Sequence, residues 1–351
     1  MARAILDRLI FLCVDLYLVL RHPFEARKLA VRSWSAGHLN LSIAAPRSAN
    51  AAFTWRKLMD RDPRWTVLSD KLAAKHFIAA LGVAARLPAT LWEGRAQDVP
   101  ARYLGADVVI KSNHGSGTSL FPARDGLAPE AVRRGIARAA AQNHGRAAHE
   151  WGYFDIVRKI FVEEHLASRG PLMELKIYTY GPRVLRVVQI RSEPGRPRIG
   201  SAWFYDETGT LVRSDQPTAI SKVIDRGPLA SQVPEALDIA ARLGSYFDHL
   251  RVDFIVADEG LYLGELTVYS QAGWLVGGYA PASGPSLCWD IRRSWFLRTP
   301  QRGWKGIYAR ALARHCARRA ATRPGVVAEE AGFGERFRRS LDIAQRLLAK
   351  G

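Results

Sequence analysis

The sequence predicts an α+β fold built from antiparallel strand pairs and separate helices. Three apolar strand pairs are joined by short turns that contain glycine, and helix-type segments stand between these pairs rather than after every strand. Of the 351 residues, 48% are apolar and 24% are charged, which is typical of a globular chain with two or three domains. This composition excludes a disordered, collagen-like or disulfide-rich protein.

The first element that the sequence predicts is an amphipathic helix over residues 4–20. At about 100° per residue, Arg3, Asp7, Arg8 and Asp15 fall on one side of this helix, and the remainder is apolar. The charges within the run and the lack of a small-residue cleavage site exclude a signal peptide, and Asp15 near the middle argues against a membrane span. The helix therefore either packs on the protein body or lies in a membrane interface. Both alternatives predict a cytoplasmic protein, in the second case at the inner face of the membrane.

Residues 33–66 are rich in Ala, Ser and Asn, and we expect a loop region that leads into a helix. Helical spacing follows over residues 71–81, with Ser69 or Asp70 as the N-cap and Gly82 as a stop signal. The later elements are expected in this order: a strand, turn and strand over 106–121, a helix over 127–148, a strand over 159–166, a strand pair over 173–193, a helix over 236–247, a hairpin over 250–269 and a basic helix over 310–324.

The first candidate site is the loop KSNHGSG of residues 111–117, which directly follows a strand. Gly115 and Gly117 would let the backbone approach a phosphate, the Ser and Asn side chains offer donors, and Lys111 neutralises charge. The loop has neither the Gly-Lys-Ser/Thr of a Walker loop nor the spacing GxGxxG. A phosphate-binding loop and a plain hairpin turn both fit this pattern.

The second candidate site consists of Asp253 and Glu265. They are twelve residues apart on the two strands of one hairpin, and a turn at residues 258–260 places them nearly opposite each other. Two such carboxylates repel unless a cation lies between them, and Mg²⁺ prefers oxygen ligands. Thr267 shares this face and adds an oxygen, and Arg251 could hold an anion. A salt-bridge ladder on an exposed hairpin is the alternative, but the apolar neighbours predict a buried strand pair, in which unpaired carboxylates are costly.

The third candidate site is the pair Glu163 and Glu164, which follows the apolar residues 160–162. The backbone of such a strand end can hydrogen-bond a nucleotide base while a carboxylate holds the ribose hydroxyls. The pattern by itself fits a charged strand end equally well.

The order of these segments resembles that of the ATP-grasp superfamily: DKLAAK, VVIKSNHGSG, FVEEHL, ELKIYTYGP, LRVDF and GLYLGELT. The chain looks most similar to the TupA-like ATP-grasp proteins of teichuronopeptide and polysaccharide biosynthesis, which share a WRKLxDRDPxxTxLSDK-like lead-in, the NHGSG loop and the RVDF…GELT hairpin. The resemblance covers residues 53–275. It implies an ATP-grasp fold, in which two α+β lobes clamp a nucleotide, here with extra helical N- and C-terminal segments.

The resemblance also implies a division of the chain into four parts. These are an N-terminal amphipathic helix with a lead-in segment over 1–65, a first lobe with the phosphate loop over 66–165, a second lobe with the metal-binding hairpin over 166–290, and a basic helical segment over 291–351.

For the nucleotide, the resemblance implies contacts at phosphates, at a covering loop, at a hinge that reads adenine and at the ribose, made by Lys71, Lys111, Asn113, His114, Gly115, Ser116, Gly117, Glu163, Glu164, Leu166 and Glu174. For the metal, it implies that two Mg²⁺ ions are held by Asp253, Glu265 and Thr267, the last standing where many superfamily members have Asn. For catalysis, it implies Arg251 near the acyl-phosphate and Lys176 at a phosphate.

The residues and the resemblance together predict an ATP-dependent carboxylate–amine ligase. ATP would phosphorylate a carboxylate, and an amine would attack the acyl-phosphate to leave an amide bond. We expect a role in the biosynthesis or modification of cell-envelope or capsular polysaccharide. Two alternatives are an ATP-grasp phosphotransferase acting on a sugar-type hydroxyl and a non-catalytic, membrane-associated scaffold that binds nucleotide.

The net charge of +18 lies at the two ends of the chain, with +6 over residues 1–64 and +11 over residues 292–351. This charge predicts either a solvated Arg-rich surface or attraction to an anionic partner. The anionic partner would be an acidic small-molecule or polysaccharide acceptor, or a membrane. The expected donor is an amine or amino acid. Nucleic acid is the least favoured of the anionic partners, because no zinc-finger, RNA-binding or helix-turn-helix pattern occurs in the sequence. Cys13, Cys288 and Cys316 are far apart and show no metal-ligand spacing, so we expect reduced thiols.

Overall fold

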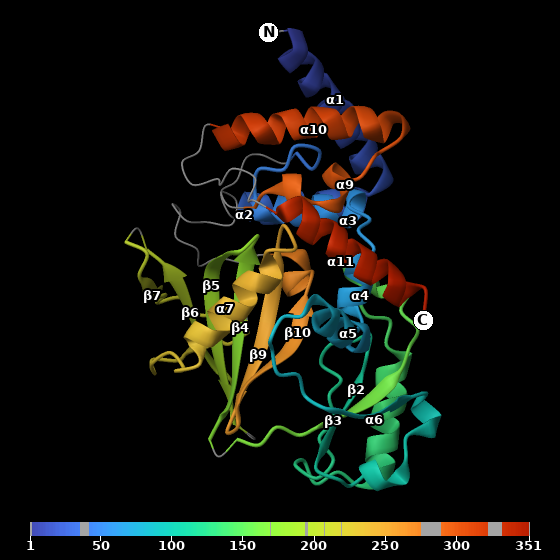
Figure 1. The fold of residues 1–351 in the computed structure, drawn as a ribbon, viewed down its shortest axis with the longest axis vertical. Coiled ribbons are helices and arrows are strands. Elements are labelled where there is room, and N and C mark those ends of the chain that lie inside the picture. The colour runs from blue at the N-terminus through green and yellow to red at the C-terminus, as the bar shows by residue number, and fades with distance from the viewer. Residues whose placement is uncertain are drawn as a thin grey trace.

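Two sheets lie side by side, and helices from both ends of the chain gather at one end of the molecule (Figure 1). The computed structural model describes residues 2–35, 42–168, 170–193, 196–206, 208–218, 220–274, 289–321 and 332–350. Cys288 and residues 322–324 of the expected basic helix lie outside the described residues.

The small sheet has the strand order β1-β3-β2, with β1 at Thr90–Gly94, β2 at Val108–Ser112 and β3 at Ile160–Glu164. Both pairings are antiparallel. Val108 and Ile110 pack with helix α6 (Pro129–Ala141) in an apolar cluster on one face. Because side chains alternate along a strand, Val109 and Lys111 belong to the other face of the sheet. Glu163 on β3 is the register partner of Val109 and belongs to that face as well.

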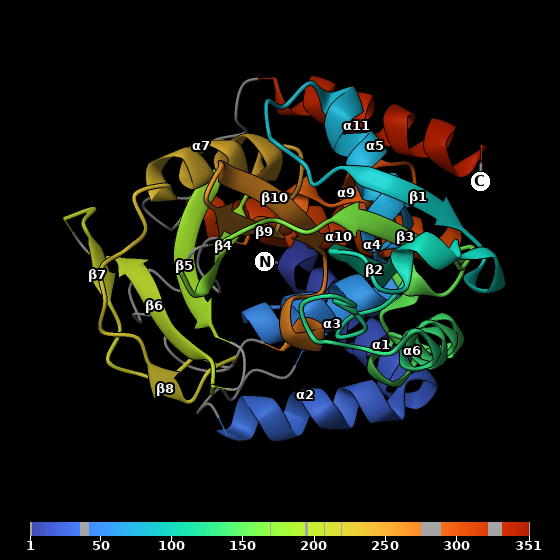
Figure 2. The same ribbon diagram turned by 90° about the horizontal axis from the view of Figure 1, so that it is seen from below.

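The large sheet is an antiparallel series with one short parallel strand at its side. Its order is β10-β9-β4-β5-β6-β7, with β8 paired to β6, and the bounds are β4 Leu172–Tyr180, β5 Arg183–Ser192, β6 Ile199–Tyr205, β7 Leu211–Arg213, β8 Val223–Ile224, β9 Leu250–Ala257 and β10 Gly260–Thr267. Helix α7 (Val233–Gly244) covers one face, as Figure 2 shows. Leu175 and Val252 belong to the main core on that face, so Lys176 and Asp253, which follow them, point to the opposite face.

A β-bulge in β10 decides which way Glu265 points. Leu263 and Leu266 both belong to the main core although they are three residues apart, because the register shifts between Leu263 and Glu265 and absorbs Gly264. Beyond the shift, Glu265 is the register partner of Asp253. The predicted opposition of these two carboxylates is confirmed.

Three hydrogen bonds join the β9–β10 hairpin to segments that flank the small sheet. The backbone N–H of Leu263 on β10 donates to the carbonyl of Arg86 at 2.8 Å, and the Arg86 guanidinium donates to the carbonyl of Glu259 at 2.7 Å. The backbone N–H of Asp258 donates to the carbonyl of Ala167 in the link between β3 and β4. The hairpin that carries Asp253 is therefore tied directly to the segments that flank the small sheet.

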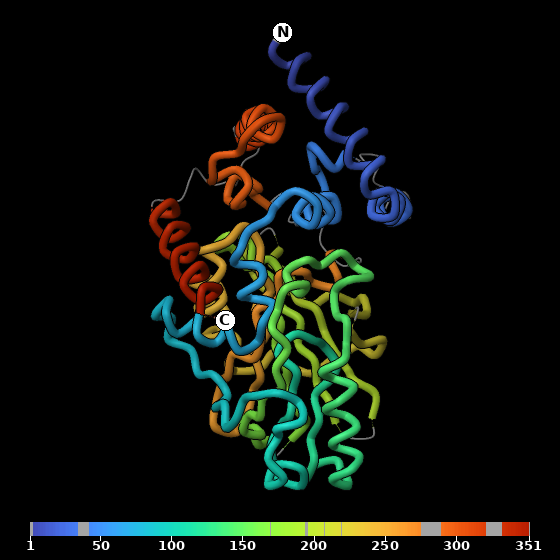
Figure 3. The backbone as a smooth tube through the Cα atoms, turned by 90° about the vertical axis from the view of Figure 1, so that its right-hand side faces the viewer, coloured from blue at the N-terminus to red at the C-terminus, as the bar shows by residue number. Residues whose placement is uncertain are grey.

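Helices from the two ends of the chain share a second apolar core and lie together at one end of the molecule (Figure 3): α1 Ala2–Arg21, α2 Pro23–Ser35, α3 Ala49–Met59, α9 Trp295–Arg298 and α10 Gly303–Ala321. A buried hydrogen-bond chain links them, because Trp55 Nε1 donates to the Tyr308 hydroxyl and this hydroxyl donates to the carbonyl of Ala44, both at 2.7 Å. Helix α11 (Phe333–Leu348) packs instead on α4 (Arg64–Ser69) and α5 (Lys71–Leu81). Among the described helices, none combines the length and the apolar character that crossing a bilayer requires.

Helix α5 has the predicted ends. Asp70 is its N-cap, with a side chain that accepts hydrogen bonds from two backbone N–H groups of the first turn, and Gly82 ends it in the left-handed conformation. The predicted loop over residues 33–66 is wrong in its second half, where α3 occupies Ala49–Met59. The Ser48 side chain accepts from the backbone N–H of Ala51 and starts this helix.

Two further expectations need correction. The second strand expected within 106–121 is reduced to one bridge between Ile110 and Leu120, since Pro122 has no backbone N–H with which to continue the ladder. The helix expected over 127–148 ends at Ala141, because Gly145 adopts a φ of +80° and begins a separate 3₁₀ turn.

Candidate active site

Lys176, Asp253 and Glu265 form a row across three neighbouring strands of the large sheet. Lys176 on β4 is the register partner of Asp253 on β9, which is the register partner of Glu265 on β10. The Nζ of Lys176 lies 3.2 Å from Asp253 Oδ2 and 2.6 Å from Glu174 Oε2. A cation and carboxylates are thus neighbours on the sheet face opposite α7.

Arg251 holds Asp253 in a two-point ion pair. Its Nε and Nη2 donate to Oδ1 and Oδ2 of Asp253, each at 2.6 Å, and Nη2 also donates to Thr267 Oγ1 at 2.9 Å. Burial opposes the ionisation of Asp253, but the charges of Arg251 and Lys176 outweigh it and lower the pKa of this carboxyl. Burial also opposes the charge of Lys176, and Asp253 and Glu174 outweigh that effect and raise the pKa of the lysine. Arg251, Lys176 and Asp253 are therefore charged at neutral pH.

Glu265 has no such partner. Within the described part of the chain, its half-buried carboxylate accepts no hydrogen bond and forms no ion pair. Its charge acts on its surroundings: burial lowers the pKa of His144 and the Glu265 charge opposes this shift, whereas burial raises the pKa of Tyr153 and the Glu265 charge adds to it. Of the two carboxylates in the row, Glu265 is the one whose oxygens are available to a ligand.

Glu163 on the small sheet is held by two lysines. The Nζ atoms of Lys75 on α5 and Lys111 on β2 each lie 2.5 Å from its carboxylate. Burial opposes the ionisation of Glu163, but the charges of Lys111 and Lys75 outweigh it and lower its pKa. Burial lowers the pKa of Lys75. This group is a second cluster of buried charges, on the face of the small sheet opposite α6.

Asn113 anchors the start of the phosphate-type loop. Its Nδ2 donates to Asp70 Oδ2 at 2.9 Å and to the carbonyl of Val157 at 3.0 Å, and its Oδ1 accepts from the backbone N–H of Lys159 at 2.9 Å. The side chain is fully buried. It therefore shapes the loop, and its backbone is engaged as well, because its N–H donates to the carbonyl of Lys159 at 3.0 Å and its carbonyl accepts from the N–H of Lys71.

His114 is also buried. Its ring nitrogens lie 3.2 Å from Asn113 Oδ1 and 3.2 Å from the carbonyl of Gln142. Burial lowers the pKa of His114, so the ring is neutral at pH 7. This imidazole, like the Asn113 amide, is occupied in fixing the loop.

The exposed part of the loop begins after Gly115. A Cβ at Gly115 would lie 2.5 Å from Gln142 Oε1, so the backbone here is closely packed. Ser116 and Gly117 are exposed, and Gly117 adopts a φ of +72° with open space around its Cα. The backbone of 115–117 is the portion that a phosphate could approach.

Lys71 ties this loop to the first turn of α5. Its backbone N–H donates to the carbonyl of Asn113 at 2.9 Å, and its Nζ donates to the carbonyl of Gly115. Burial lowers the pKa of His144, the charge of Lys71 lowers it further, and the charge of Glu265 raises it. The charges of Lys71 on α5 and Glu265 on β10 thus act on the same imidazole.

The remaining predicted residues lie around the link between the sheets. Glu164 ends β3, and its Oε1 accepts from the backbone N–H of Ala89 at 2.7 Å. Leu166 is half-buried in the link. Glu174 lies on β4, where its carboxylate accepts from Lys176.

A family model described as TupA-like ATP-grasp matches residues 51–276, which is well over half of the chain. The chain belongs to the TupA-like ATP-grasp family. Its fold is therefore the ATP-grasp fold, as the sequence predicted, and family membership supports an ATP-dependent ligase that binds a nucleotide. No curated protein sequence matches the chain.

Solved structures that resemble this TupA-like ATP-grasp protein include three ligases or synthetases. The D-alanine–D-alanine ligase from Bacillus anthracis is 15% identical, with 72% of this chain and 68% of the ligase covered and a TM-score of 0.35. The ATP-grasp ligase PsnB, in complex with a minimal precursor, is 16% identical, with 72% and 62% covered and a TM-score of 0.33. The D-cycloserine synthetase DcsG is 16% identical, with 72% and 71% covered and a TM-score of 0.34.

The lead-in segment of this family member, WRKLMDRDP, contacts the ends of the two strands that carry the site. Arg56 is completely buried, and its guanidinium donates to Asp248 Oδ1 at 2.7 Å and to the carbonyl of Val268 at 2.9 Å. Asp60 accepts from the backbone N–H of Phe296 at 2.8 Å. The segment thus joins the terminal helices to the start of β9 and the end of β10, where the charged row stands.

A left-handed turn follows the hairpin, and the sequence did not indicate it. Gln271, Ala272 and Gly273 have φ values of 53°, 55° and 75°. The Nζ of Lys57 donates to the carbonyl of Ala272 at 2.6 Å and holds the turn. Non-glycine residues in this conformation cost on the order of 1 kcal/mol each, and such strain gathers at functional sites. The turn begins four residues after Thr267, so it borders the site.

Two more neighbours of the site were not predicted. Lys75 follows Lys71 by one helical turn in DKLAAK, and this i, i+4 spacing could have indicated it. His144 carries no local signal, because its importance comes only from the two sheets that meet around it.

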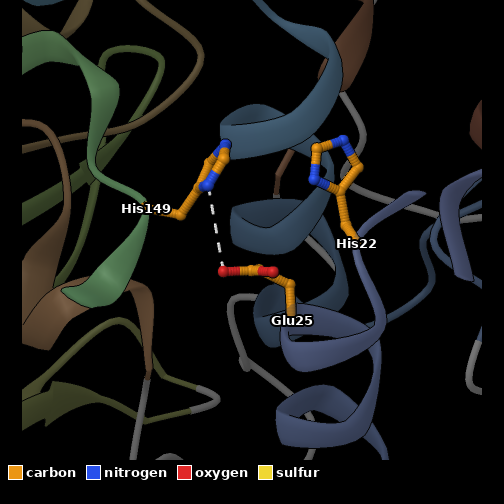
Figure 4. A group of neighbouring side chains, drawn as sticks. All are labelled: His22, Glu25 and His149. Carbon is orange, nitrogen blue, oxygen red and sulfur yellow. Dashed lines mark ion pairs between the residues drawn. The ribbon is translucent and has the colours of Figure 1, made fainter. Parts of the chain in front are cut away.

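A different cluster, shown in Figure 4, brings together His22, Glu25 and His149. Their ligand-type atoms lie within 4.8 Å of one another, and His149 Nδ1 is 3.9 Å from Glu25 Oε1. Neighbouring ligand atoms of a tetrahedral zinc ion are about 3.4 Å apart, given bonds of about 2.0–2.1 Å. Burial, together with cations that include Arg61, lowers the pKa values of both imidazoles. The wide spacing and the nearby positive charge fit a polar contact between α2 and a loop better than a metal centre.

Proposed function

We propose that this TupA-like ATP-grasp protein is an ATP-dependent carboxylate–amine ligase that works through an acyl-phosphate. The observation that carries the proposal is the row of Lys176, Asp253 and Glu265 across one face of the large sheet, with the Arg251 guanidinium bound to Asp253. A nucleotide triphosphate needs cations along one side and metal-binding carboxylates along the other. The two sheets offer these two sides.

The donor set of Asp253, Glu265 and Thr267 fits Mg²⁺, which takes carboxylate and hydroxyl oxygens together with phosphate oxygens. Glu265 offers oxygens that no other described residue engages, and Asp253 would exchange Arg251 for metal. We propose two Mg²⁺ ions at these residues, and such ions would neutralise charge on the phosphates.

The nucleotide is proposed to run from the loop to the link between the sheets. The phosphates would contact the side chains of Lys71 and Lys111 and the backbone of the loop. The base and ribose would contact the end of β3, the link between the sheets, and β4. The residues proposed for these contacts are Lys71, Lys111, Asn113, His114, Gly115, Ser116, Gly117, Glu163, Glu164, Leu166 and Glu174.

In the proposed reaction, an oxygen of the substrate carboxylate attacks the γ-phosphorus, and the bond to the β–γ bridging oxygen breaks with its electron pair leaving on ADP. Arg251 and Lys176 stabilise charge on the transferring phosphoryl group. The amine then attacks the acyl carbon and gives its proton to solvent, and phosphate leaves. The products are an amide, ADP and phosphate, and the protein contributes chiefly positioning.

The proposed acceptor is acidic, either a small molecule or a polysaccharide of the cell envelope or capsule, and the donor is an amine or amino acid. The support is the positive charge at both ends of the chain around a near-neutral body. We propose that the protein works in the cytoplasm at the inner face of the membrane, with peripheral contact through residues 4–20.

The first test is ATP binding by calorimetry with and without Mg²⁺. The wild type should bind ATP in a Mg²⁺-dependent manner, and the variant Asp253→Asn/Glu265→Gln should lose that dependence. The matched control is Glu235→Gln/Asp238→Asn, which removes the same charges from exposed positions of α7. If the wild type does not bind ATP, the ligase proposal fails.

Product analysis then separates the ligase from a phosphotransferase. A ligase requires an amine and transfers one ¹⁸O atom from a labelled acceptor carboxylate to the phosphate that is released. A phosphotransferase acting on a sugar-type hydroxyl gives a phosphorylated product without an amine. ATP binding with neither product would favour the scaffold alternative.

A further inference from the structure

Helix α1 has its two carboxylates turned into the protein. Asp7 is only 1% exposed and is bound by Arg314 and Arg318 of α10, at 2.5 and 3.0 Å. Asp15 accepts hydrogen bonds of 2.8 Å from the two backbone N–H groups of residues 43–44. These contacts fix the rotation of the helix about its axis, so the opposite side must face outward.

That outward side is apolar. Leu9, Leu12, Leu16 and Leu20 form a stripe at helical spacing, and the exposed fractions reach 65% at Leu12 and 74% at Leu20. Trp304 of α10 extends the stripe sideways through a ring contact with α1. Single exposed leucines are ordinary on a protein surface, but a continuous row of large apolar side chains marks an interaction site.

The charges around this stripe have one sign. The described residues 2–33 and 289–320 expose several Arg and Lys side chains, including Arg3, Arg8, Arg21, Lys305 and Arg310, and no exposed Asp or Glu. The few carboxylates of these segments are buried or half-buried. The surface is therefore apolar in its middle and positive around it.

We propose that this surface, formed by the outer side of α1 with the adjoining end of α10, docks on an anionic lipid bilayer. An amphipathic helix with flanking cations lies in the plane of such an interface, and each basic residue near it adds attraction to anionic headgroups. The aromatic pair Tyr17 and Trp304, with ring centroids 5.2 Å apart, is of the type that prefers the headgroup level. A second copy of the chain is a poorer occupant, because two positive surfaces would meet.

The proposed docking leaves the candidate active site accessible. Figures 1 and 3 show α1 and α10 at one end of the molecule and the small sheet with α6 at the other end. A bilayer that contacts α1 therefore lies at the end of the molecule away from the small sheet. The inference rests on the terminal helices and is independent of the proposed reaction.

The test is sedimentation of the full chain with vesicles of 30% phosphatidylglycerol in phosphatidylcholine, compared with pure phosphatidylcholine. The wild type should bind the anionic vesicles, and added salt should weaken binding. Leu12→Asp/Leu16→Asp should weaken it at least tenfold, whereas Val212→Asp/Leu348→Asp, which alters exposed apolar positions elsewhere, should not. Arg3→Glu/Arg8→Glu should weaken it by about fivefold or more per residue.

Two readouts keep the result interpretable. Circular dichroism with urea unfolding establishes that each variant is folded, and ATP calorimetry reports on the active site separately. Absence of binding to anionic vesicles by the folded wild type would overturn the proposal, and so would equal binding by Leu12→Asp/Leu16→Asp. Light scattering that shows a stable dimer, dispersed by that same variant, would assign the surface to a second copy instead.

Discussion

Arg251 and Asp253 are two residues apart on β9, and two hydrogen bonds of 2.6 Å join them. Because alternate residues share a face of a strand, the guanidinium lies directly over the carboxylate that we propose as a metal ligand. Lys176 adds a third contact at 3.2 Å. The site therefore contains its own cations for Asp253, and metal binding at this residue means exchange of one positive group for another. Glu265, which has no partner among the described residues, is where a metal ion would arrive first.

This difference predicts that two similar substitutions change the free energy of unfolding by very different amounts. Asp253→Asn leaves Arg251 as a buried cation without its carboxylate and leaves Lys176 with Glu174 alone, so the free energy of unfolding should fall by about 3 kcal/mol. Glu265→Gln removes no contact and should change it by less than about 0.5 kcal/mol. Urea unfolding at pH 7 measures both. Equal losses for the two variants would contradict the pairing that we describe.

Glu163 predicts non-additive behaviour of its two lysines. Lys75→Met or Lys111→Met leaves the carboxylate with one cation, whereas the double variant leaves it buried and unpaired. The loss of unfolding free energy in the double variant should exceed the sum of the single losses by about 1 kcal/mol or more. Urea unfolding of the four proteins gives this coupling energy. A sum that agrees within about 0.3 kcal/mol would show that the two lysines act independently.

The loop can be tested as a phosphate site by a matched pair of glycine substitutions. Gly117 and Gly209 have φ values of 72° and 82°, and a Cβ at either would meet no atom within 4 Å. Ala should therefore cost about 1 kcal/mol of stability at each position, through the backbone alone. Gly117→Ala should also weaken ATP binding several-fold in calorimetry, and Gly209→Ala, in the turn between β6 and β7, should not. Equal affinities would favour a plain turn at 113–117.

Glu150 predicts a pH dependence of stability. Burial raises its pKa to about 7, although the charge of Lys57 opposes the shift. The folded state therefore holds a proton that the unfolded chain releases near pH 4.3. The corresponding stability is fully present below about pH 4 and is lost as the pH rises through 7, by about 2–3 kcal/mol.

The comparison with Glu150→Gln isolates this effect. Burial lowers the pKa of Lys57 to about 8, so this lysine stays largely charged between pH 5 and 7 in both proteins. Urea unfolding across that range should show stability falling with pH more steeply in the wild type than in the variant. Parallel curves would mean that Glu150 is ionised throughout.

The local signals in the sequence were sufficient for much of the site. The caps of α5 and the turn of the β9–β10 hairpin come from short-range chemistry, so their positions followed from residue types. The pairing of Asp253 with Glu265 followed from the turn predicted at residues 258–260, whereas the structure reaches the same pairing through a two-residue turn and the bulge at Gly264. The bulge at Gly264 left its trace in the unusual three-residue spacing of Leu263 and Leu266.

Other features depend on partners that are distant in the sequence. The predicted helix over 4–20 does pack on the protein body, but its two carboxylates face inward, because Arg314 binds Asp7 and the backbone of residues 43–44 binds Asp15. The burial of Asn113 and His114 follows from the segment around Gln142 and Lys159, which no local pattern places beside the loop. The left-handed turn at Gln271 is built from residue types that rarely adopt it, and it depends on Lys57.

The contact between Asp7 and Arg314 has a consequence for the order in which the protein is completed. The two residues are separated by 307 positions. At a synthesis rate of about 5–20 residues per second, roughly 15–60 s pass between the appearance of α1 and that of its partner on α10. Helix α1 is therefore made well before its partner on α10, and during that interval its leucine stripe is available to a nearby bilayer while the residues between them are still being added.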